Sequence, residues 1–135
     1  MSAAAGRPQV LLIEPDGLVR GTVASVCREL QLVRLQQATS IAQGEKWMQS
    51  NVDHGLLLSL AERDAALALL TRLRAGELRC EADIPVAVMA ASADAELVVR
   101  LKELDVRRLL LQPFRLRDVV HTLEQLWPMP EILVA

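Results

Sequence analysis

The stretch VLLIEPDGLVR, Val10–Arg20, decides the fold class. Its first four residues are apolar, as in a strand that is covered on both faces, and a short acidic turn and the start of a helical period follow. A strand that leads directly into a helix is typical of a parallel βα unit. The segment therefore predicts an α/β protein with a parallel sheet.

The same alternation continues along the rest of the chain. Apolar stripes at helical spacing lie between the short apolar runs, and the second run alternates apolar with polar residues, which predicts an edge strand with one solvated face. We expect the whole of each stripe, including Leu18, Leu30 and Leu116, to face the core. The predicted strands are Val10–Ile13, Val33–Gln37, Gly55–Leu60, Val86–Ala90 and Arg108–Leu111, and the predicted helical stripes are Leu18–Leu30, Ser40–Gln49 with an interruption at Gly44, Leu67–Leu73, Leu97–Leu104 and Leu116–Trp127.

Composition places the chain among globular domains. Its 135 residues are 52% hydrophobic and 24% charged, and 15 Lys and Arg against 17 Asp and Glu leave a formal charge of −2. A charge this small gives no long-range attraction for nucleic acid or for an anionic membrane. We expect a flexible segment at 1–8, one domain at 9–127 and a tail at 128–135, in which Ile132–Val134 packs on the domain or on a partner.

Cysteines and apolar runs bear on the cellular compartment. Cys27 and Cys80 lie without CxxC spacing or a histidine cluster, which predicts neither a disulfide framework nor a zinc site. No stretch approaches 18 uninterrupted apolar residues, and the first residues lack the apolar centre of a signal peptide. A cytoplasmic location is the expectation.

The carboxyl ends of the strands are where function is expected. Right-handed crossovers put helices on both faces of a parallel sheet, and the ligand crevice of such a sheet lies outside the carboxyl ends of its strands. The residues at those ends are Glu14–Pro15–Asp16, Ser59, Ala90–Ala91–Ser92 and Gln112–Pro113–Phe114.

Three segments together carry a resemblance to a known family. VLLIEPDGLVR, IPVAVMAAS at Ile84–Ser92 and LLLQPF at Leu109–Phe114 resemble the receiver domains of two-component response regulators, and the resemblance covers roughly Gln9–Trp127. The landmarks occur in the right order, at intervals of 44, 31 and 22 residues. The resemblance implies a flavodoxin-like, doubly wound (βα)5 fold whose five parallel strands have the order 2-1-3-4-5.

The residues at the family's functional positions differ from the family's pattern. Receivers hold Mg²⁺ with an acidic pair after the first strand, accept a phosphoryl group on an aspartate that ends the third strand, and use a Thr or Ser after the fourth strand and a Lys before the proline of the fifth. Many also carry an aromatic switch residue where this chain has Leu109. The corresponding residues here are Glu14 and Pro15, Ser59, Ala90 and Gln112.

Each replacement removes a different part of the phosphotransfer chemistry. Ser59 is a neutral hydroxyl without a neighbouring base in the sequence pattern, and Pro15 offers no side-chain oxygen to Mg²⁺. Ala90 cannot hydrogen-bond a phosphoryl oxygen, and Gln112 has no charge to offset one. The resemblance thus implies a degenerate receiver that has no catalytic residue, no metal and no cofactor, and is not an enzyme.

Structural alternatives exist for the same residues. Glu14 and Asp16 also suit the start of a helix, where carboxylates cap free N–H groups and favour the positive end of the dipole. Ser59 and Ser92 suit loop or cap hydroxyls, and Gln112–Pro113 suits a turn whose cis or trans state the sequence leaves open. His54 and His121 lack companion metal ligands, and Asp53 and Asp64 lie outside the expected crevice.

A basic cluster remains around the last predicted strand. In receivers the face formed by the fourth helix, fifth strand and fifth helix is the usual surface for dimerisation and partner docking. Interleaved carboxylates predict local ion pairs on this face. We expect a protein-interaction module of bacterial signalling that docks there on an unidentified protein or on a second copy, and binding of cyclic di-GMP through the same arginines is the alternative. The residues concerned are Arg100, Arg107, Arg108, Arg115 and Arg117.

Overall fold

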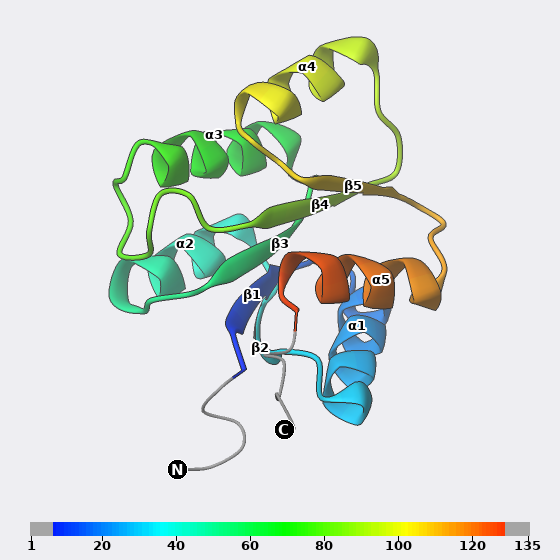
Figure 1. Cartoon of the computed structure of the whole chain (residues 1–135). Coiled ribbons are helices and arrows are strands. Elements are labelled where there is room, and N and C mark those ends of the chain that lie inside the picture. Colours follow the sequence, from blue (N-terminus) through cyan, green and yellow to red (C-terminus); the bar gives the residue numbers. More distant parts are fainter. Residues whose placement is uncertain (1–6, 129–135) are drawn as a thin grey trace, which may run out of the picture.

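The computed structural model describes residues 7–128, in which five strands alternate with five helices (Figure 1). Most of the expected N-terminal segment and C-terminal tail, including Ile132–Val134, lies outside the described residues. The elements are β1 (Gln9–Ile13), α1 (Gly17–Leu30), β2 (Arg34–Ala38), α2 (Ile41–Ser50), β3 (Gly55–Ser59), α3 (Arg63–Arg74), β4 (Val86–Ala90), α4 (Ala95–Glu103), β5 (Arg108–Leu111) and α5 (Leu116–Leu126).

The strands form one parallel sheet in the order β2-β1-β3-β4-β5. The predicted fold class and strand order are therefore confirmed. β2 and β5 are the edge strands. In β2 the exposed residues are Arg34 and Gln37, which lie on opposite faces, so the predicted single solvated face is not observed. The pairing of β2 begins at Arg34, one residue later than expected, because Arg34 is the partner of the first residue of β1.

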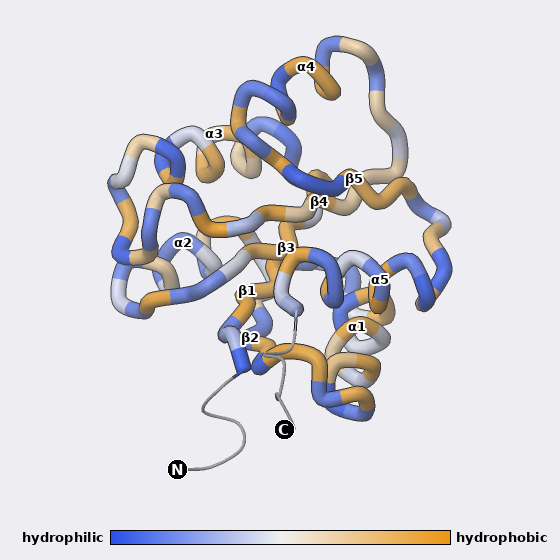
Figure 2. Tube along the Cα trace, viewed as in Figure 1, coloured by the Kyte–Doolittle hydropathy of each residue, from blue (hydrophilic) through white to orange (hydrophobic). Residues whose placement is uncertain are grey.

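Side chains of successive strand residues point to opposite faces, and this period divides the core in two. Leu11 and Ile13 pack with α2, α3 and α4, whereas Val10 and Leu12 pack with α1 and α5. The helices lie on the two sides accordingly (Figure 1), and apolar residues concentrate along the strands between them (Figure 2). Both faces of the sheet are covered, as the continuous apolar runs of β1, β3 and β4 require.

Three apolar residues at helix ends do not face the core. Leu18 is 81% exposed, Leu30 is 56% exposed and Leu116 is 50% exposed, so the expectation that the complete stripes are buried is wrong. Leu18 and Leu116 lie in the first turns of α1 and α5, and Leu30 ends α1. A helix of 14 residues is longer than a strand of five, and the ends of its stripe extend past the sheet.

Two glycines mark close approaches between elements. Gly44 lies within α2, and the helix continues through it without a break. A Cβ at this position would collide with the Ile13 side chain, so the glycine lets α2 lie directly on β1. Gly55 leaves room at the start of β3 for the indole of Trp127, which is buried and donates from Nε1 to the His54 carbonyl at 3.1 Å. This contact anchors the end of α5 to the sheet.

Two further observations concern the compartment. Cys27 and Cys80 are both buried and free. Between residues 7 and 128, no helix is both long enough and apolar enough to cross a bilayer.

Candidate functional site

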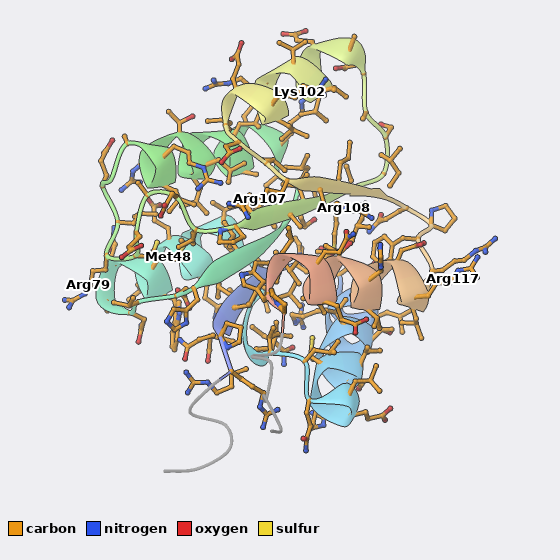
Figure 3. All side chains as sticks on the ribbon, viewed as in Figure 1. Met48, Arg79, Lys102, Arg107, Arg108 and Arg117 are labelled. Carbon is orange, nitrogen blue, oxygen red and sulfur yellow. The ribbon has the colours of Figure 1, made fainter. Side chains whose placement is uncertain are left out.

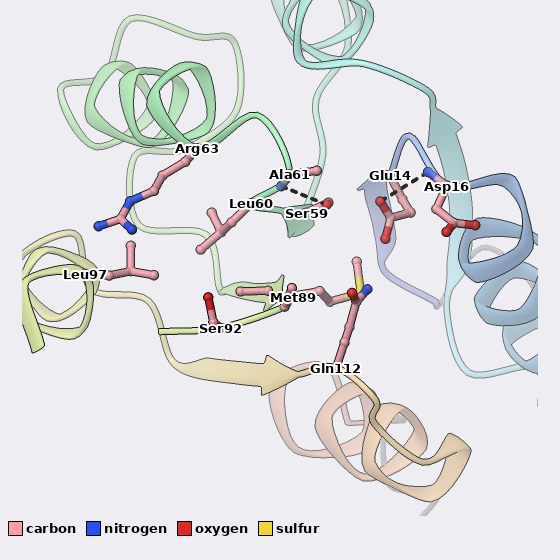
Figure 4. A pocket seen from close by; sticks show the side chains of 12 residues that line it. Glu14, Asp16, Ser59, Leu60, Ala61, Arg63, Met89, Ser92, Leu97 and Gln112 are labelled. Atoms are coloured by element: carbon pink, nitrogen blue, oxygen red, sulfur yellow. Dashed lines mark hydrogen bonds between the residues drawn. The ribbon is translucent and has the colours of Figure 1, made fainter. Parts of the chain in front are cut away.

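A pocket of about 360 Å³ opens at the carboxyl edge of the sheet, beside the ends of β1, β3, β4 and β5 (Figure 4). Four of the five positions that sequence comparison singled out line it together. These are Glu14, Ser59, Ala90 and Gln112. The fifth, Pro15, is exposed and does not contribute to the lining. We call this site the carboxyl-edge pocket.

Glu14 is a buried carboxyl group with one unsatisfied oxygen. Its side chain is 2% exposed, Oε2 accepts from the Asp16 backbone N–H at 3.4 Å, and Oε1 has no hydrogen-bond partner among the described residues. Burial raises the pKa of Glu14, although hydrogen bonding from Ser59 and from the Asp16 amide acts in the opposite direction. Arg20 donates to the Glu14 carbonyl at 2.8 Å instead of to the carboxylate.

Asp16 caps the first helix. Its Oδ1 accepts from the backbone N–H groups of Leu18 at 2.9 Å and Val19 at 3.2 Å, so the structural alternative for this residue is confirmed. Asp16 is exposed and lies at the rim of the pocket.

Ser59 ends β3 and accepts a hydrogen bond at Oγ from the Ala61 N–H at 3.2 Å, as a turn hydroxyl does. The Glu14 carboxyl lies near the Ser59 hydroxyl, which acts to lower the pKa of that carboxyl. The structure brings the two together because β1 and β3 are paired neighbours in the sheet.

The donor set of the pocket is a poor fit for a magnesium ion. Mg²⁺ prefers an octahedral shell of oxygens that usually includes one or two carboxylates. Here Glu14 offers one free oxygen, one oxygen of Asp16 is engaged in capping α1, and Pro15 has no side-chain oxygen. Among residues 7–128, no group of three or more His, Cys, Asp or Glu side chains is arranged to hold a metal.

The turn after β5 closes the pocket on the side of α5. The Gln112 backbone N–H donates to the Ala90 carbonyl at 2.8 Å, and its side chain extends into the pocket (Figure 4). The Gln112–Pro113 peptide bond is cis, which answers the question that the sequence left open. Leu109, at the position of the family's aromatic switch residue, is partly buried and packs against the core.

The arginines of the predicted basic cluster lie on separate grooves. Arg107 and Arg108 line one small groove with Lys102, and Arg117 lies at a distance from them, at the start of α5 (Figure 3). Arg100 faces α3 and donates to Thr71 Oγ1 at 3.0 Å. No single groove collects them, and cyclic di-GMP binding stays a prediction.

The carboxylates of this face pair with fewer of its cations than the sequence predicts. In the part of the chain that the structure describes, Arg100 and Glu103 form its one salt bridge, at 3.3 Å. Asp118 is engaged with the Arg115 backbone N–H at 3.0 Å. Five side chains of the face therefore have no carboxylate of the described residues within salt-bridge distance: Lys102, Arg107, Arg108, Arg115 and Arg117.

Two half-exposed leucines are close in sequence to the last of these cations. Leu111, the end of β5, is 49% exposed, and Leu116, the first residue of α5, is 50% exposed. Together with Arg115 and Arg117 they form what we call the β5–α5 patch. Sequence periodicity did not reveal the two leucines, because it places Leu116 in the core and Leu111 in a strand.

The remaining polar candidates have structural partners. Asp53 is 1% exposed and accepts from Trp47 Nε1 and from Gln9 Nε2. His54 accepts at Nδ1 from the Gln9 backbone N–H. Both precede β3, at the amino end of the strands and away from the carboxyl-edge pocket. His121 and Asp64 are exposed on α5 and α3.

The architecture defines the class of fold, which is that of response regulator receiver domains. Similar solved structures include a response regulator from Thermotoga maritima (18% identity, 89% of this chain and 97% of that chain, TM-score 0.76) and the non-phosphorylated HemR receiver domain from Leptospira biflexa (23% identity, 89% and 94%, TM-score 0.73). The chemotaxis protein CheY4 of Vibrio cholerae is similar over 89% of this chain and 98% of its own, with 12% identity and a TM-score of 0.76. No protein-family model and no curated protein matches the sequence. At these identities the likeness establishes the fold.

Proposed function

We propose that this protein is a receiver-like module of a signalling assembly that acts by docking on a protein partner and does not accept a phosphoryl group. It is not an enzyme. The observation that carries the proposal is the face of α4, β5 and α5, where five cationic side chains lack carboxylate partners among residues 7–128 and two leucines are half exposed.

The chemistry of the carboxyl-edge pocket supports the negative half of the proposal. A phosphoryl group needs an acceptor carboxylate, a metal ion and a positive charge to offset its own. At the corresponding positions the pocket presents the Ser59 hydroxyl, a donor set that is a poor fit for Mg²⁺, and the neutral Gln112 amide. A change of state must therefore come from the binding of a ligand or partner that prefers one state.

The composition of the docking face favours an acidic partner. Exposed apolar side chains supply the buried centre of an interface, and surrounding charges set the choice of partner and the rate of association. The β5–α5 patch has this composition, with Leu111 and Leu116 beside two arginines. Two copies related by a two-fold axis through the patch would place like charges opposite each other, so an acidic protein fits better than a second copy.

Charge reversal tests the docking proposal. The full chain is immobilised and the proteins that it captures from the source cell extract are compared between two double variants, Arg115→Glu/Arg117→Glu in the patch and Arg28→Glu/Arg79→Glu as a control at exposed sites elsewhere. We expect the patch variant to lose a partner that the wild type and the control both retain. We also expect capture of that partner to weaken as salt concentration rises.

The partner's sequence supplies a further criterion. A partner with an acidic contact region agrees with the proposal. A partner captured equally by both double variants, or one whose binding does not respond to salt, would contradict the assignment of the docking face.

A further inference from the structure

At the acidic end of the carboxyl-edge pocket, the Ser59 hydroxyl lies near the Glu14 carboxyl group, but one carboxyl oxygen has no hydrogen-bond partner among the described residues. Glu14 Oε1 is buried and has no partner within residues 7–128, and the Arg20 guanidinium is engaged with backbone carbonyls. Buried acceptors without a donor are uncommon in native proteins. A positively charged donor would satisfy this oxygen best, because hydrogen bonds between charged groups are the strong ones.

The opposite end of the pocket carries one cation, Arg63, which is paired with Asp94. Arg63, the first residue of α3, lies across the pocket from Glu14 (Figure 4). Its guanidinium is 3.5 Å from the Asp94 carboxylate, a long and solvent-exposed pair. The first turn of α3 also lacks a side-chain cap, because the Glu62 carboxylate accepts from the Ile41 N–H at 3.0 Å. Its free N–H groups attract an anion at this end, and the exposed Asp64 in the same turn acts against that attraction.

Apolar side chains separate the two charged ends. Leu60 and Met89 extend into the pocket between Glu14 and Arg63 (Figure 4). This stretch suits a short aliphatic chain. A pocket of about 360 Å³ has room for a small molecule of this kind.

We propose that the carboxyl-edge pocket binds a small ω-amino acid, with its ammonium group at Glu14 Oε1 and its carboxylate at Arg63 and the first turn of α3. The aliphatic chain crosses Leu60 and Met89. A diamine would bring a second cation to Arg63, and a dicarboxylate would bring an anion to Glu14, so the charge pattern disfavours both. Because Glu14 Oε1 is buried, a side chain at this end must move to admit the ammonium group, and the proposal assigns that movement to Gln112.

Calorimetric titration of the full chain tests this assignment directly. The probes are γ-aminobutyrate, δ-aminovalerate and ε-aminocaproate at neutral pH and low salt, and the matched analogues are caproate, which lacks the amine, and hexylamine, which lacks the carboxylate. We expect saturable binding of at least one ω-amino acid. We expect each analogue to bind about tenfold or more weakly, the usual effect of losing a charged hydrogen bond.

Variants assign the two ends. Glu14→Gln should weaken ω-amino acid binding about 10- to 100-fold, and Arg63→Gln should weaken it about tenfold while leaving hexylamine binding unchanged. Glu29→Gln, an exposed site on α1, should bind as the wild type does. Circular dichroism spectra confirm that each variant is folded.

Three results would overturn the proposal. They are the absence of saturable binding by all three ω-amino acids at millimolar concentration, equal binding of an ω-amino acid and its amine-free analogue, and unchanged binding by folded Glu14→Gln. Equal affinity for hexylamine and ε-aminocaproate would overturn the role of Arg63. None of these results bears on the docking face, which the capture experiment tests separately.

Discussion

Gly55→Ala should destabilise the fold, although replacing glycine in a strand ordinarily stabilises it. An added Cβ would lie less than 3.0 Å from three atoms of the Trp127 indole, closer than Cβ contacts come in real structures. Trp127 is buried and donates to the His54 carbonyl at 3.1 Å. The ring must move, and it anchors the helix that carries half of the β5–α5 patch.

Two opposing effects set the magnitude of this change. The loss of glycine's extra conformational entropy favours the variant by about 0.5–1 kcal/mol. Overpacking a filled core costs about 1–3 kcal/mol, and loss of the Trp127–His54 hydrogen bond costs about 1 kcal/mol more. Steric overlap prevails, and we expect Gly55→Ala to lower the free energy of unfolding by about 1–3 kcal/mol.

Urea unfolding followed by circular dichroism measures the effect, with Gly21→Ala as the matched control. Gly21 lies on the exposed side of α1, where an added Cβ meets nothing within 4 Å, so this variant should gain up to about 1 kcal/mol. The cost of Gly55→Ala should shrink in a Trp127→Leu background, because the overlap is gone. A Gly55→Ala protein as stable as the wild type, or one that gains stability as Gly21→Ala does, would refute the reasoning.

Three further changes test other parts of the structure. Burial raises the pKa of Glu14 in the folded state, so ionisation of this residue lowers the stability of the fold as the pH rises above the unfolded pKa of 4.5. In urea unfolding, Glu14→Gln should therefore be more stable than the wild type at pH 8, and the difference should vanish below pH 4.5. An equal difference at both pH values would contradict this. Asp94 caps α4, since its Oδ1 accepts from the Leu97 N–H at 2.8 Å. In thermal unfolding, Asp94→Ala should lower the free energy of unfolding by about 1 kcal/mol, whereas Asp83→Ala, at an exposed site, should leave it nearly unchanged. The Arg74 guanidinium donates to four backbone carbonyls, and Arg74→Lys should lower the free energy of unfolding by about 2–4 kcal/mol because the lysine cannot make all of these hydrogen bonds. A decrease below about 0.5 kcal/mol would show that these hydrogen bonds add little stability.

The strands could be predicted from the sequence because the length and the periodicity of its apolar runs indicate them, and the strand order followed from the resemblance to receiver domains. Continuous apolar runs of four to six residues identified β1, β3 and β4, and the prediction for Val86–Ala90 matches the observed strand residue for residue. Helix periodicity did not show where a stripe runs past the sheet, so Leu18 and Leu116 were assigned to the core. Gly44 and Gly55 likewise depend on which element lies opposite, which a single sequence does not show.

The sequence predicted which residues form the candidate site, but it did not predict their hydrogen bonds. Because the carboxyl ends of parallel strands meet at one edge, the sequence placed Glu14, Ser59 and Gln112 together, and the structure does so as well. The sequence could not predict that one Glu14 oxygen lacks a hydrogen-bond partner, because this depends on where the Arg20 guanidinium and the Asp16 amide point. The arginines near β5 form one cluster in the sequence. In the structure they lie along different grooves, because residues that are adjacent in a strand or a helix point in different directions.

Intact-protein mass spectrometry after incubation with acetyl phosphate and Mg²⁺ tests the central claim most directly. A variant that restores the family's residues, Pro15→Asp/Ser59→Asp/Ala90→Thr/Gln112→Lys, serves as the comparison under the same conditions. The account predicts that the mass of the natural chain does not change. A gain of one phosphoryl group on the natural chain, absent in Ser59→Ala, would contradict it.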